Sequence, residues 1–229
     1  MALILSIETS TTVCSVAIHR DGALLANKET DESNAHSSKL MLFIEACLKE
    51  SESSVQDLNA IAVSAGPGSY TGLRIGVSTA KGLAYAQNIP IVAVSAMESL
   101  AKKVLKIEAD EGYIIPVLDA RRMEVYAQVF DFDLQEKKEI ESVILDQGSF
   151  ANLLNEGLVY FIGDGASKTK EVIQSKNAVF VEGSISSIEM GEVAWKKFQK
   201  SEFEDIAYFV PNYLKEFKVL KSKKNLLLK

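Results

Sequence analysis

The chain has 229 residues, enough for one large domain or for two lobes of about 100 residues each. With 47% hydrophobic and 24% charged residues, its composition is that of an ordinary globular protein. A net charge of −6 gives the surface no general attraction for RNA, so any RNA contact would need a local basic patch or a partner.

The two cysteines, Cys14 and Cys47, lie in apolar surroundings without the CxxC spacing of a metal site. This argues against a disulfide framework and a zinc site, and buried free thiols fit a reducing cytoplasm. The first residues, MALILSIETS, lack the basic region of a signal peptide, and no window approaches 18 consecutive apolar residues. We therefore expect a cytoplasmic protein that has no membrane partner.

The first half of the chain predicts three strands followed by alternating helices and strands. Short apolar runs indicate the strands, and Asp21-Gly22 is a strong hairpin signal between the second and third. The expected elements, in chain order, are strands at 2–7, 13–18 and 23–28, a helix at 35–50, a strand at 60–65, a helix at 72–87, a strand at 91–94 and a helix at 96–106.

The second half repeats this order with different loop lengths. In both halves the first strand ends in an acid, Glu8 or Asp119, and a later strand ends in glycine, at Gly66 or Gly163. The expected elements are strands at 113–118, 124–130 and 137–144, a short helix at 149–156, a strand at 159–162, and helices at 167–176 and 187–200.

This repeat predicts an α/β protein with a two-lobed, actin-like (ribonuclease-H-like, ASKHA) fold. Each lobe would be a mixed sheet flanked by helices, because strand–helix–strand crossovers require parallel pairing. We place the N-terminal lobe at 1–106 and the C-terminal lobe at 107–229, with the last segment able to return to the first lobe. Ligands of such folds lie in the cleft between the lobes.

The stretch 61–88 is the most distinctive part of the sequence. A short strand ends at a glycine-rich turn, and a long helix follows. The turn either holds a phosphate or only turns a corner. A phosphate cradle is disfavoured because the Walker pattern is missing and Pro67 removes one N–H donor. We expect an interface or ligand loop here, formed by Gly66, Gly68, Ser69, Thr71 and Arg74.

The helix after this turn carries a narrow row of very small residues, at Gly72, Gly76, Ala80 and Ala84. Glycine inside a helix costs roughly 0.5–1 kcal/mol relative to alanine, so a close approach of backbones is the expected reason for it. The row either packs on the sheet of its own lobe or forms a helix–helix interface with another subunit. We identify it as the candidate interface.

Residues for catalysis are scarce. The histidines His19 and His36 are 17 residues apart, without HxxxH spacing, and there is no GxSxG nucleophile motif. His19 is expected to be exposed beside the Asp21-Gly22 turn, and His36 to cap a helix or bond to a loop. We predict no catalytic residue and no metal site.

Charged residues mark two further features. Asp119, Arg121, Arg122 and Glu124 surround one predicted turn, which is either a salt-bridged turn or a contact point for a ligand or partner. The tail is rich in lysine and is either a solvated end or an RNA-binding patch. The expected cleft contacts are Glu8, His36, Asp119 and Arg121. The tail lysines are Lys215, Lys218, Lys221, Lys223, Lys224 and Lys229.

Four segments resemble the TsaB (YeaZ) family of the bacterial tRNA threonylcarbamoyladenosine pathway. They are ILSIETSTTVCSVAI at 4–18, HSSKL at 36–40, AIAVSAGPGSYTGLRIGVSTAKGLA at 60–84 and DARRMEVYAQVF at 119–130, with a weaker match, FIGDG, at 161–165. The resemblance covers most of 3–130. It implies the actin-like fold and a partnership with TsaD, the paralogue that transfers the threonylcarbamoyl group to the adenosine beside the tRNA anticodon, and with the ATPase TsaE.

Two departures from related proteins separate the chain from catalysts. TsaD-like proteins carry a metal-binding HxxxH, and in our alignment Ala96 and Leu100 take the places of the two histidines. Actin-like ATPases have a glycine soon after the first acid, whereas Glu8 is followed by Thr9, Ser10 and Thr11.

We therefore expect a non-catalytic subunit that binds and activates TsaD and forms a homodimer in isolation. It would contact tRNA only indirectly and would bind no cofactor alone, although a nucleotide could sit at the shared interface. The alternative is an ATP- or metal-dependent transferase or glycoprotease-type enzyme that acts on its own.

Overall fold

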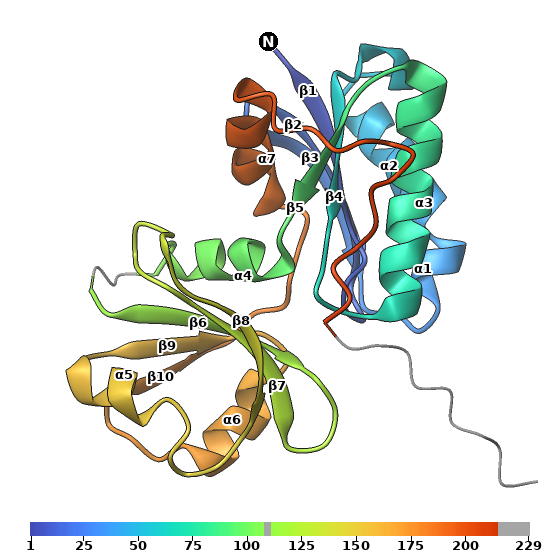
Figure 1. The fold of residues 1–229 in the computed structure, drawn as a ribbon. Coiled ribbons are helices and arrows are strands. Elements are labelled where there is room, and N and C mark those ends of the chain that lie inside the picture. The colour runs from blue at the N-terminus through green and yellow to red at the C-terminus, as the bar shows by residue number, and fades with distance from the viewer. Residues whose placement is uncertain (108–110, 215–229) are drawn as a thin grey trace, which may run out of the picture.

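The computed structural model describes residues 1–107 and 111–214 and contains two five-stranded sheets, each with helices on its faces (Figure 1). The predicted two-lobed α/β fold is confirmed. The lysine-rich tail at 215–229 lies outside the described residues.

The first sheet has the strand order β3-β2-β1-β4-β5. Strand β2 is antiparallel to both of its neighbours, β1 and β3, whereas β4 and β5 run parallel to β1. Nearly every residue of β1 and β2 is buried because helices cover both faces of the sheet. The strands are β1 (Leu3–Glu8), β2 (Cys14–Arg20), β3 (Ala23–Thr30), β4 (Ala60–Ser64) and β5 (Ile91–Val94).

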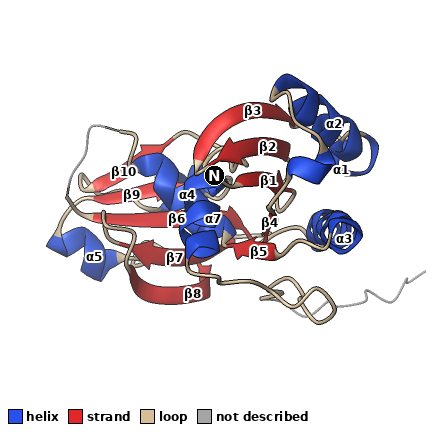
Figure 2. Ribbon diagram, turned by 90° about the horizontal axis from the view of Figure 1, so that it is seen from above, coloured by secondary structure: helices blue, strands red, loops and turns tan. Residues whose placement is uncertain are grey.

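The helices α1 (Ala35–Ser38), α2 (Leu40–Glu50) and α3 (Tyr70–Gln87) lie on one side of the first sheet, as Figure 2 shows from above. The predicted helix at 35–50 is thus two helices, and a 3-10 turn, η1 (Val55–Asp57), follows them. Helix α3 begins two residues before its predicted start, because the Ser69 hydroxyl accepts a hydrogen bond from the Gly72 N–H at 3.2 Å.

The second sheet has the order β10-β9-β6-β7-β8, which repeats the first sheet with β6 in the place of β1. The predicted internal repeat is therefore confirmed. Strand β10 escaped prediction because it has only four residues, all half-buried. The elements are β6 (Tyr113–Asp119), β7 (Glu124–Phe130), β8 (Glu136–Ile144), β9 (Val159–Ile162), β10 (Ala178–Val181), α4 (Ala96–Val104), α5 (Ala151–Glu156) and α6 (Ala166–Val172).

Within the described residues, two segments cross between the sheets. The first crossing runs through α4, which starts beside the first sheet and packs on the second. The second is the segment 182–189, which leads to α7 (Met190–Gln199) on the free face of the first sheet. Residues 203–213, which we call the strap, then run along the first sheet, where the Asn212 N–H donates to the Ala65 carbonyl at 2.8 Å.

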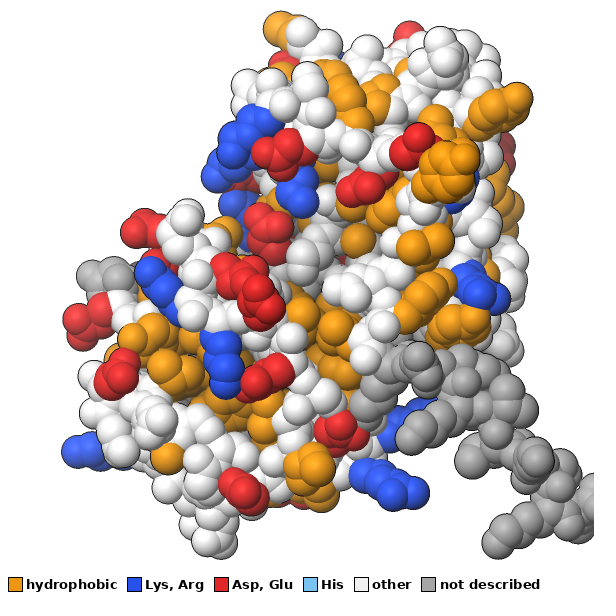
Figure 3. All heavy atoms as spheres, viewed as in Figure 1, with side chains coloured by type: hydrophobic (Ala, Val, Ile, Leu, Met, Phe, Trp, Pro, Cys, Tyr) orange, Lys and Arg blue, Asp and Glu red, His pale blue; other side chains and the backbone are white. Residues whose placement is uncertain are grey.

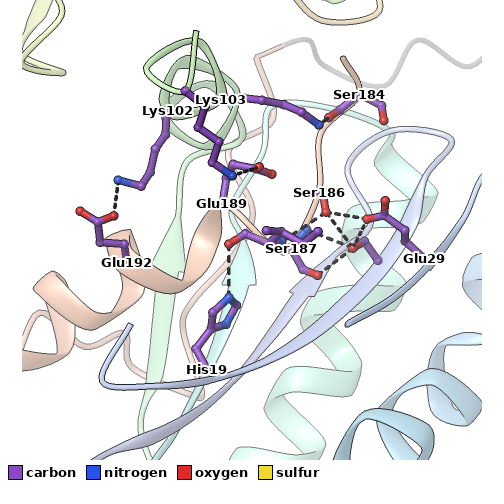
Figure 4. Close-up of polar contacts among 12 residues, drawn as sticks. His19, Glu29, Lys102, Lys103, Ser184, Ser186, Ser187, Glu189 and Glu192 are labelled. Carbon is purple, nitrogen blue, oxygen red and sulfur yellow. Dashed lines mark hydrogen bonds and ion pairs between the residues drawn. The ribbon is translucent and has the colours of Figure 1, made fainter. Parts of the chain in front are cut away.

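Polar contacts join the two crossings (Figure 4). On α4, Lys102 forms an ion pair with Glu192 at 2.6 Å. Just after the end of α4, Lys106 forms an ion pair with Glu189 at 2.7 Å. Lys103 donates to the Ser184 carbonyl at 3.0 Å. In each pair one partner is largely buried, Glu189 in the segment that returns to the first lobe and Lys102 on α4, while the other partner is exposed.

The prediction of an exposed His19 is wrong. Its side chain is only 1% exposed, because α7 and the segment before it cover this face of β2. Nε2 lies 3.2 Å from the Ile188 carbonyl and Nδ1 lies 3.1 Å from the Ser6 hydroxyl. The prediction of exposure relied on the neighbouring turn, Asp21-Gly22, whereas the residues that bury His19 lie about 170 positions away in the sequence.

Candidate functional site

The loop after β1 packs directly against the turn before α3. The Ser69 N–H donates to the Ser10 carbonyl at 2.5 Å, and a Cβ added at Gly68 would collide with Ser10. A Cβ at Gly66, which has a φ of 89°, would press on Leu73 and the Asn212 carbonyl. This glycine-rich turn is therefore filled by the chain's own atoms.

Glu8 lies beneath this closed turn and is fully buried. Its Oε1 accepts a hydrogen bond from the Ser10 N–H at 2.6 Å, while Oε2 has no hydrogen-bond partner among the described residues. Burial raises the pKa of the Glu8 carboxyl above its usual range. A buried acid next to a filled turn does not fit a nucleotide phosphate, whose negative charge would add to that of the carboxylate.

The row of small residues on α3 faces the chain's own sheet. All four of its members are buried, and a Cβ at Gly72 or Gly76 would collide with Thr9. The Thr9 hydroxyl also donates to the Gly72 carbonyl at 2.8 Å. The close approach is therefore made within the chain, which corrects the interface prediction for Gly72, Gly76, Ala80 and Ala84.

The opposite face of α3 is open and also carries small residues. Ser78, Gly82 and Ala86 are spaced four apart and are all exposed. A Cβ added at Gly82 would meet nothing within 4 Å, so packing within the described part of the chain gives no reason for a glycine there. Tyr85, which is 80% exposed, stands beside them.

Aromatic residues continue this surface towards the strap. Tyr70 and Tyr213 lie with ring centroids 4.9 Å apart, and the Arg74 guanidinium sits 4.2 Å from the centre of the Tyr70 ring. On the strap, Tyr208 is 84% exposed and Val210 is 70% exposed. In Figure 3, hydrophobic side chains gather on this side of the first lobe.

Sequence reasoning selected Thr71 and Arg74 on this surface, and the structure places both in the exposed part of α3. It missed Tyr85, Tyr208 and Tyr213. The helical spacing of Tyr85 from Ser78 and Gly82 could have revealed the first of these, but no local signal indicates that the strap returns to this place.

Helix α4 holds the two positions that align with metal ligands of TsaD-like proteins. Ala96 and Leu100 are both buried in the hydrophobic core beneath the second sheet. Neither side chain has a metal-binding atom, so these positions do not fit a metal ion. Among the described residues there is also no group of three or more His, Cys, Asp or Glu that could hold one.

Asp119 is the last residue of β6, as Glu8 is the last residue of β1, so the two acids hold equivalent positions in the two sheets. Lys168 contacts Asp119 at 2.9 Å, and the Asp119 N–H donates to Asp164 at 2.8 Å. Partial burial raises the pKa of Asp119, but the contacts with Lys168 and Arg121 outweigh it and hold that pKa below its usual range. The Arg121 side chain is exposed, and its charge acts on Asp119 without an ion pair between the two side chains among the described residues.

His36 lies on α1, half-buried. Burial lowers its pKa, and its Nε2 has no hydrogen-bond partner among the residues that the structure describes. No contact joins it to Asp119 or Arg121, so its role as a cleft contact stays a prediction.

In the described part of the chain, no helix is long and apolar enough to cross a membrane.

Comparison with known proteins agrees with this geometry. A family model described as "TsaD: tRNA N6-adenosine threonylcarbamoyltransferase" matches residues 24–229. The tRNA threonylcarbamoyladenosine biosynthesis protein TsaB of Bacillus subtilis is 33% identical over 223 residues, which cover 93% of each chain. The chain belongs to the TsaB family. The TsaB protein of Escherichia coli is 36% identical over 54% of this chain and 52% of its own.

Two solved structures share the fold of this chain. YeaZ from Pseudomonas aeruginosa superposes with a TM-score of 0.82 at 23% identity, covering 93% of this chain and all of that one. An activator of 2-hydroxyisocaproyl-CoA dehydratase from Clostridium difficile reaches a TM-score of 0.50 at 10% identity, over 88% of this chain and 96% of its own. These likenesses show the actin-like fold alone.

Proposed function

We propose that this chain is a non-catalytic subunit of the tRNA threonylcarbamoyladenosine pathway. It binds TsaD and activates it to transfer the threonylcarbamoyl group to the adenosine beside the anticodon, and TsaE joins through the same complex. Alone, the chain pairs with a second copy and binds neither metal nor nucleotide. In the complex, a nucleotide can lie at the interface shared with TsaD.

Membership of the TsaB family supports the pathway, because its named relatives are tRNA threonylcarbamoyladenosine biosynthesis proteins. The match to the TsaD family model supports the proposal only in that it relates the chain to the protein that it would bind.

Two features support the absence of catalysis by this chain. The turn before α3 is filled by Ser10, and the positions that align with metal ligands are Ala96 and Leu100. An enzyme of the alternative kind would need a nucleotide or a metal, and neither place has room or ligands for one.

The open face of α3 around Gly82 is the observation that carries the binding proposal. A glycine inside an exposed helix weakens the helix, yet a Cβ added at Gly82 would meet nothing within 4 Å among the described residues. A partner helix that packs closely over Ser78, Gly82 and Ala86 would explain it, with Tyr85 and the strap tyrosines at the edge of the contact.

Size-exclusion chromatography with the TsaD of the same organism tests this proposal. The unaltered chain should form a complex, and Gly82→Gln should weaken it at least tenfold because the longer side chain holds the helices apart. Gly157→Gln is the matched control, since a Cβ at Gly157 also meets nothing within 4 Å. Circular dichroism should show that both variants are folded.

The absence of any complex, with or without nucleotide, would refute the proposed function. A complex that forms equally well with Gly82→Gln would instead move the interface away from α3. Calorimetric titration of the isolated chain with ATP and with zinc should be flat, and tight binding of either would favour the enzyme alternative.

A further inference from the structure

The turn between β6 and β7 carries two neighbouring arginines in a backbone conformation that arginine rarely adopts. Arg121 has a φ of 68° and Arg122 a φ of 51°. Asparagine and glycine are the residues that favour two consecutive left-handed positions. Since arginine has no conformational advantage here, the reason for these residues must lie in their side chains.

Hydrogen bonds and an ion pair fix the conformation of this turn. The Arg121 N–H donates to Asp119 at 2.5 Å, and Ala120 donates to the Glu124 carbonyl at 3.1 Å. The Lys168 ammonium contacts Asp119, the Arg122 carbonyl and the Glu124 carbonyl, all within 3 Å. The nearest acid and the backbone carbonyls of the turn are therefore occupied in fixing its shape.

In the described part of the chain, neither guanidinium group forms an ion pair in that support, although the charge of Arg121 helps to lower the pKa of Asp119. Both arginines are exposed, and neither has an ion pair with a carboxylate among the described residues. Arg74, by contrast, lies over the Tyr70 ring. The turn thus presents two adjacent, permanently charged forks to solvent on a rigid base, an arrangement that suits bidentate contact with phosphate oxygens.

We infer that the Arg121–Arg122 turn binds the phosphate backbone of tRNA within the complex with TsaD. This inference rests on the proposed function, because it requires tRNA to reach the chain in that complex. On a protein of net charge −6, unpaired and rigidly held arginines are the groups that RNA phosphates can use.

The test measures binding of unmodified tRNA to the full complex by fluorescence anisotropy at several salt concentrations. The variant Arg121→Asn/Arg122→Gly removes both charges and supplies the residues that the turn favours, so its melting temperature should be equal or higher. We expect tRNA affinity to fall about tenfold, and the slope of log K against log salt concentration to decrease by about 1.5–2.

The matched control is Arg20→Gln/Lys176→Gln, which removes two exposed charges that also lack ion pairs among the described residues. It should change tRNA affinity less than twofold. The Arg121→Asn/Arg122→Gly variant should bind TsaD as well as the unaltered chain does. Titration with ATP should give the same ATP affinity for the complex that contains this variant and for the complex that contains the unaltered chain.

Unchanged tRNA affinity and salt slope in the turn variant would overturn the inference, and so would an equal loss in the control. Weaker binding of the turn variant to TsaD would show that the turn contacts protein. Weaker binding of ATP alone would show that the turn contacts a nucleotide. Either result also overturns the inference. If no complex with TsaD forms, the proposed function fails. The same salt titration of the isolated chain with tRNA then decides whether the turn binds RNA.

Discussion

The imidazole ring of His19 in β2 occupies the space in which Gly191 of α7 would carry a side chain. The Ile188 carbonyl can only accept a hydrogen bond, so His19 Nε2 carries the proton and Nδ1 accepts from the Ser6 hydroxyl. This neutral histidine therefore joins β1, β2 and the segment that returns from the second lobe.

Gly191→Ala should destabilise the protein by about 1–3 kcal/mol, because the new methyl group and the His19 ring cannot occupy the same space. Urea unfolding measures the change. Gly157→Ala is the control, since its site is open and its extended φ of 176° suits any residue, so a shift within about 0.5 kcal/mol is expected there. Equal midpoints for the two variants would show that α7 does not pack on His19 as described.

Stability should fall on acidification because of the same histidine. Burial lowers the pKa of His19 to about 4, against an ordinary value of 6.5. Between these values the unfolded chain binds the proton and the folded chain does not, so stability decreases as the pH falls from about 6.5 to about 4. The loss amounts to about 3 kcal/mol.

His19→Gln keeps hydrogen-bonding capacity but cannot titrate. Urea unfolding at pH 7.5 and at pH 4.5 should therefore show a decrease that is about 2–3 kcal/mol smaller in this variant than in the unaltered protein. Equal decreases in both proteins would mean that His19 is not held neutral in the folded state.

Glu8 should have the opposite effect on the alkaline side. Burial raises its pKa, so the folded chain holds this proton more tightly than the unfolded chain does. The stability that this provides is complete below the ordinary pKa of 4.5 and is lost as the pH rises through the folded value.

Glu8→Gln removes the charge but leaves an oxygen that can accept from the Ser10 N–H. We expect the variant to be more stable than the unaltered protein at pH 8, by about 1 kcal/mol or more, and similar to it at pH 4. Chemical unfolding at the two pH values measures this. Lower stability of the variant at pH 8 would show that the carboxylate has a partner that stabilises its charge.

Much of the fold could be predicted from the sequence because its signals are local. Apolar runs, the Asp21-Gly22 hairpin and the glycine turn before α3 each depend on neighbouring residues, and the repeated order of strands follows from them. Burial of His19 and the course of the strap depend on contacts between residues more than 100 positions apart. No pattern in one segment reports such contacts.

The row of small residues that was predicted as an interface faces the sheet of its own lobe. Small residues at every fourth position predict a close approach, yet α3 has two such rows, and spacing alone does not say which one the sheet covers. The row with Gly76 lies against Thr9, whereas the row with Gly82 lies open.

Alanine substitutions should therefore have opposite effects on the two rows. Gly82→Ala adds a methyl group in open space and removes the entropic cost of a helical glycine, so it should stabilise the isolated chain by about 0.5–1 kcal/mol. Gly76→Ala would place its methyl group against the Thr9 hydroxyl and should destabilise the chain by about 1–3 kcal/mol despite the same gain in helix propensity. Thermal unfolding measures both changes in stability. The chain concentration must be low enough to keep the protein monomeric, because dimer formation would also alter the apparent stability of the Gly82→Ala variant. Two changes of the same sign would mean that the rows are not divided between the sheet and the open surface.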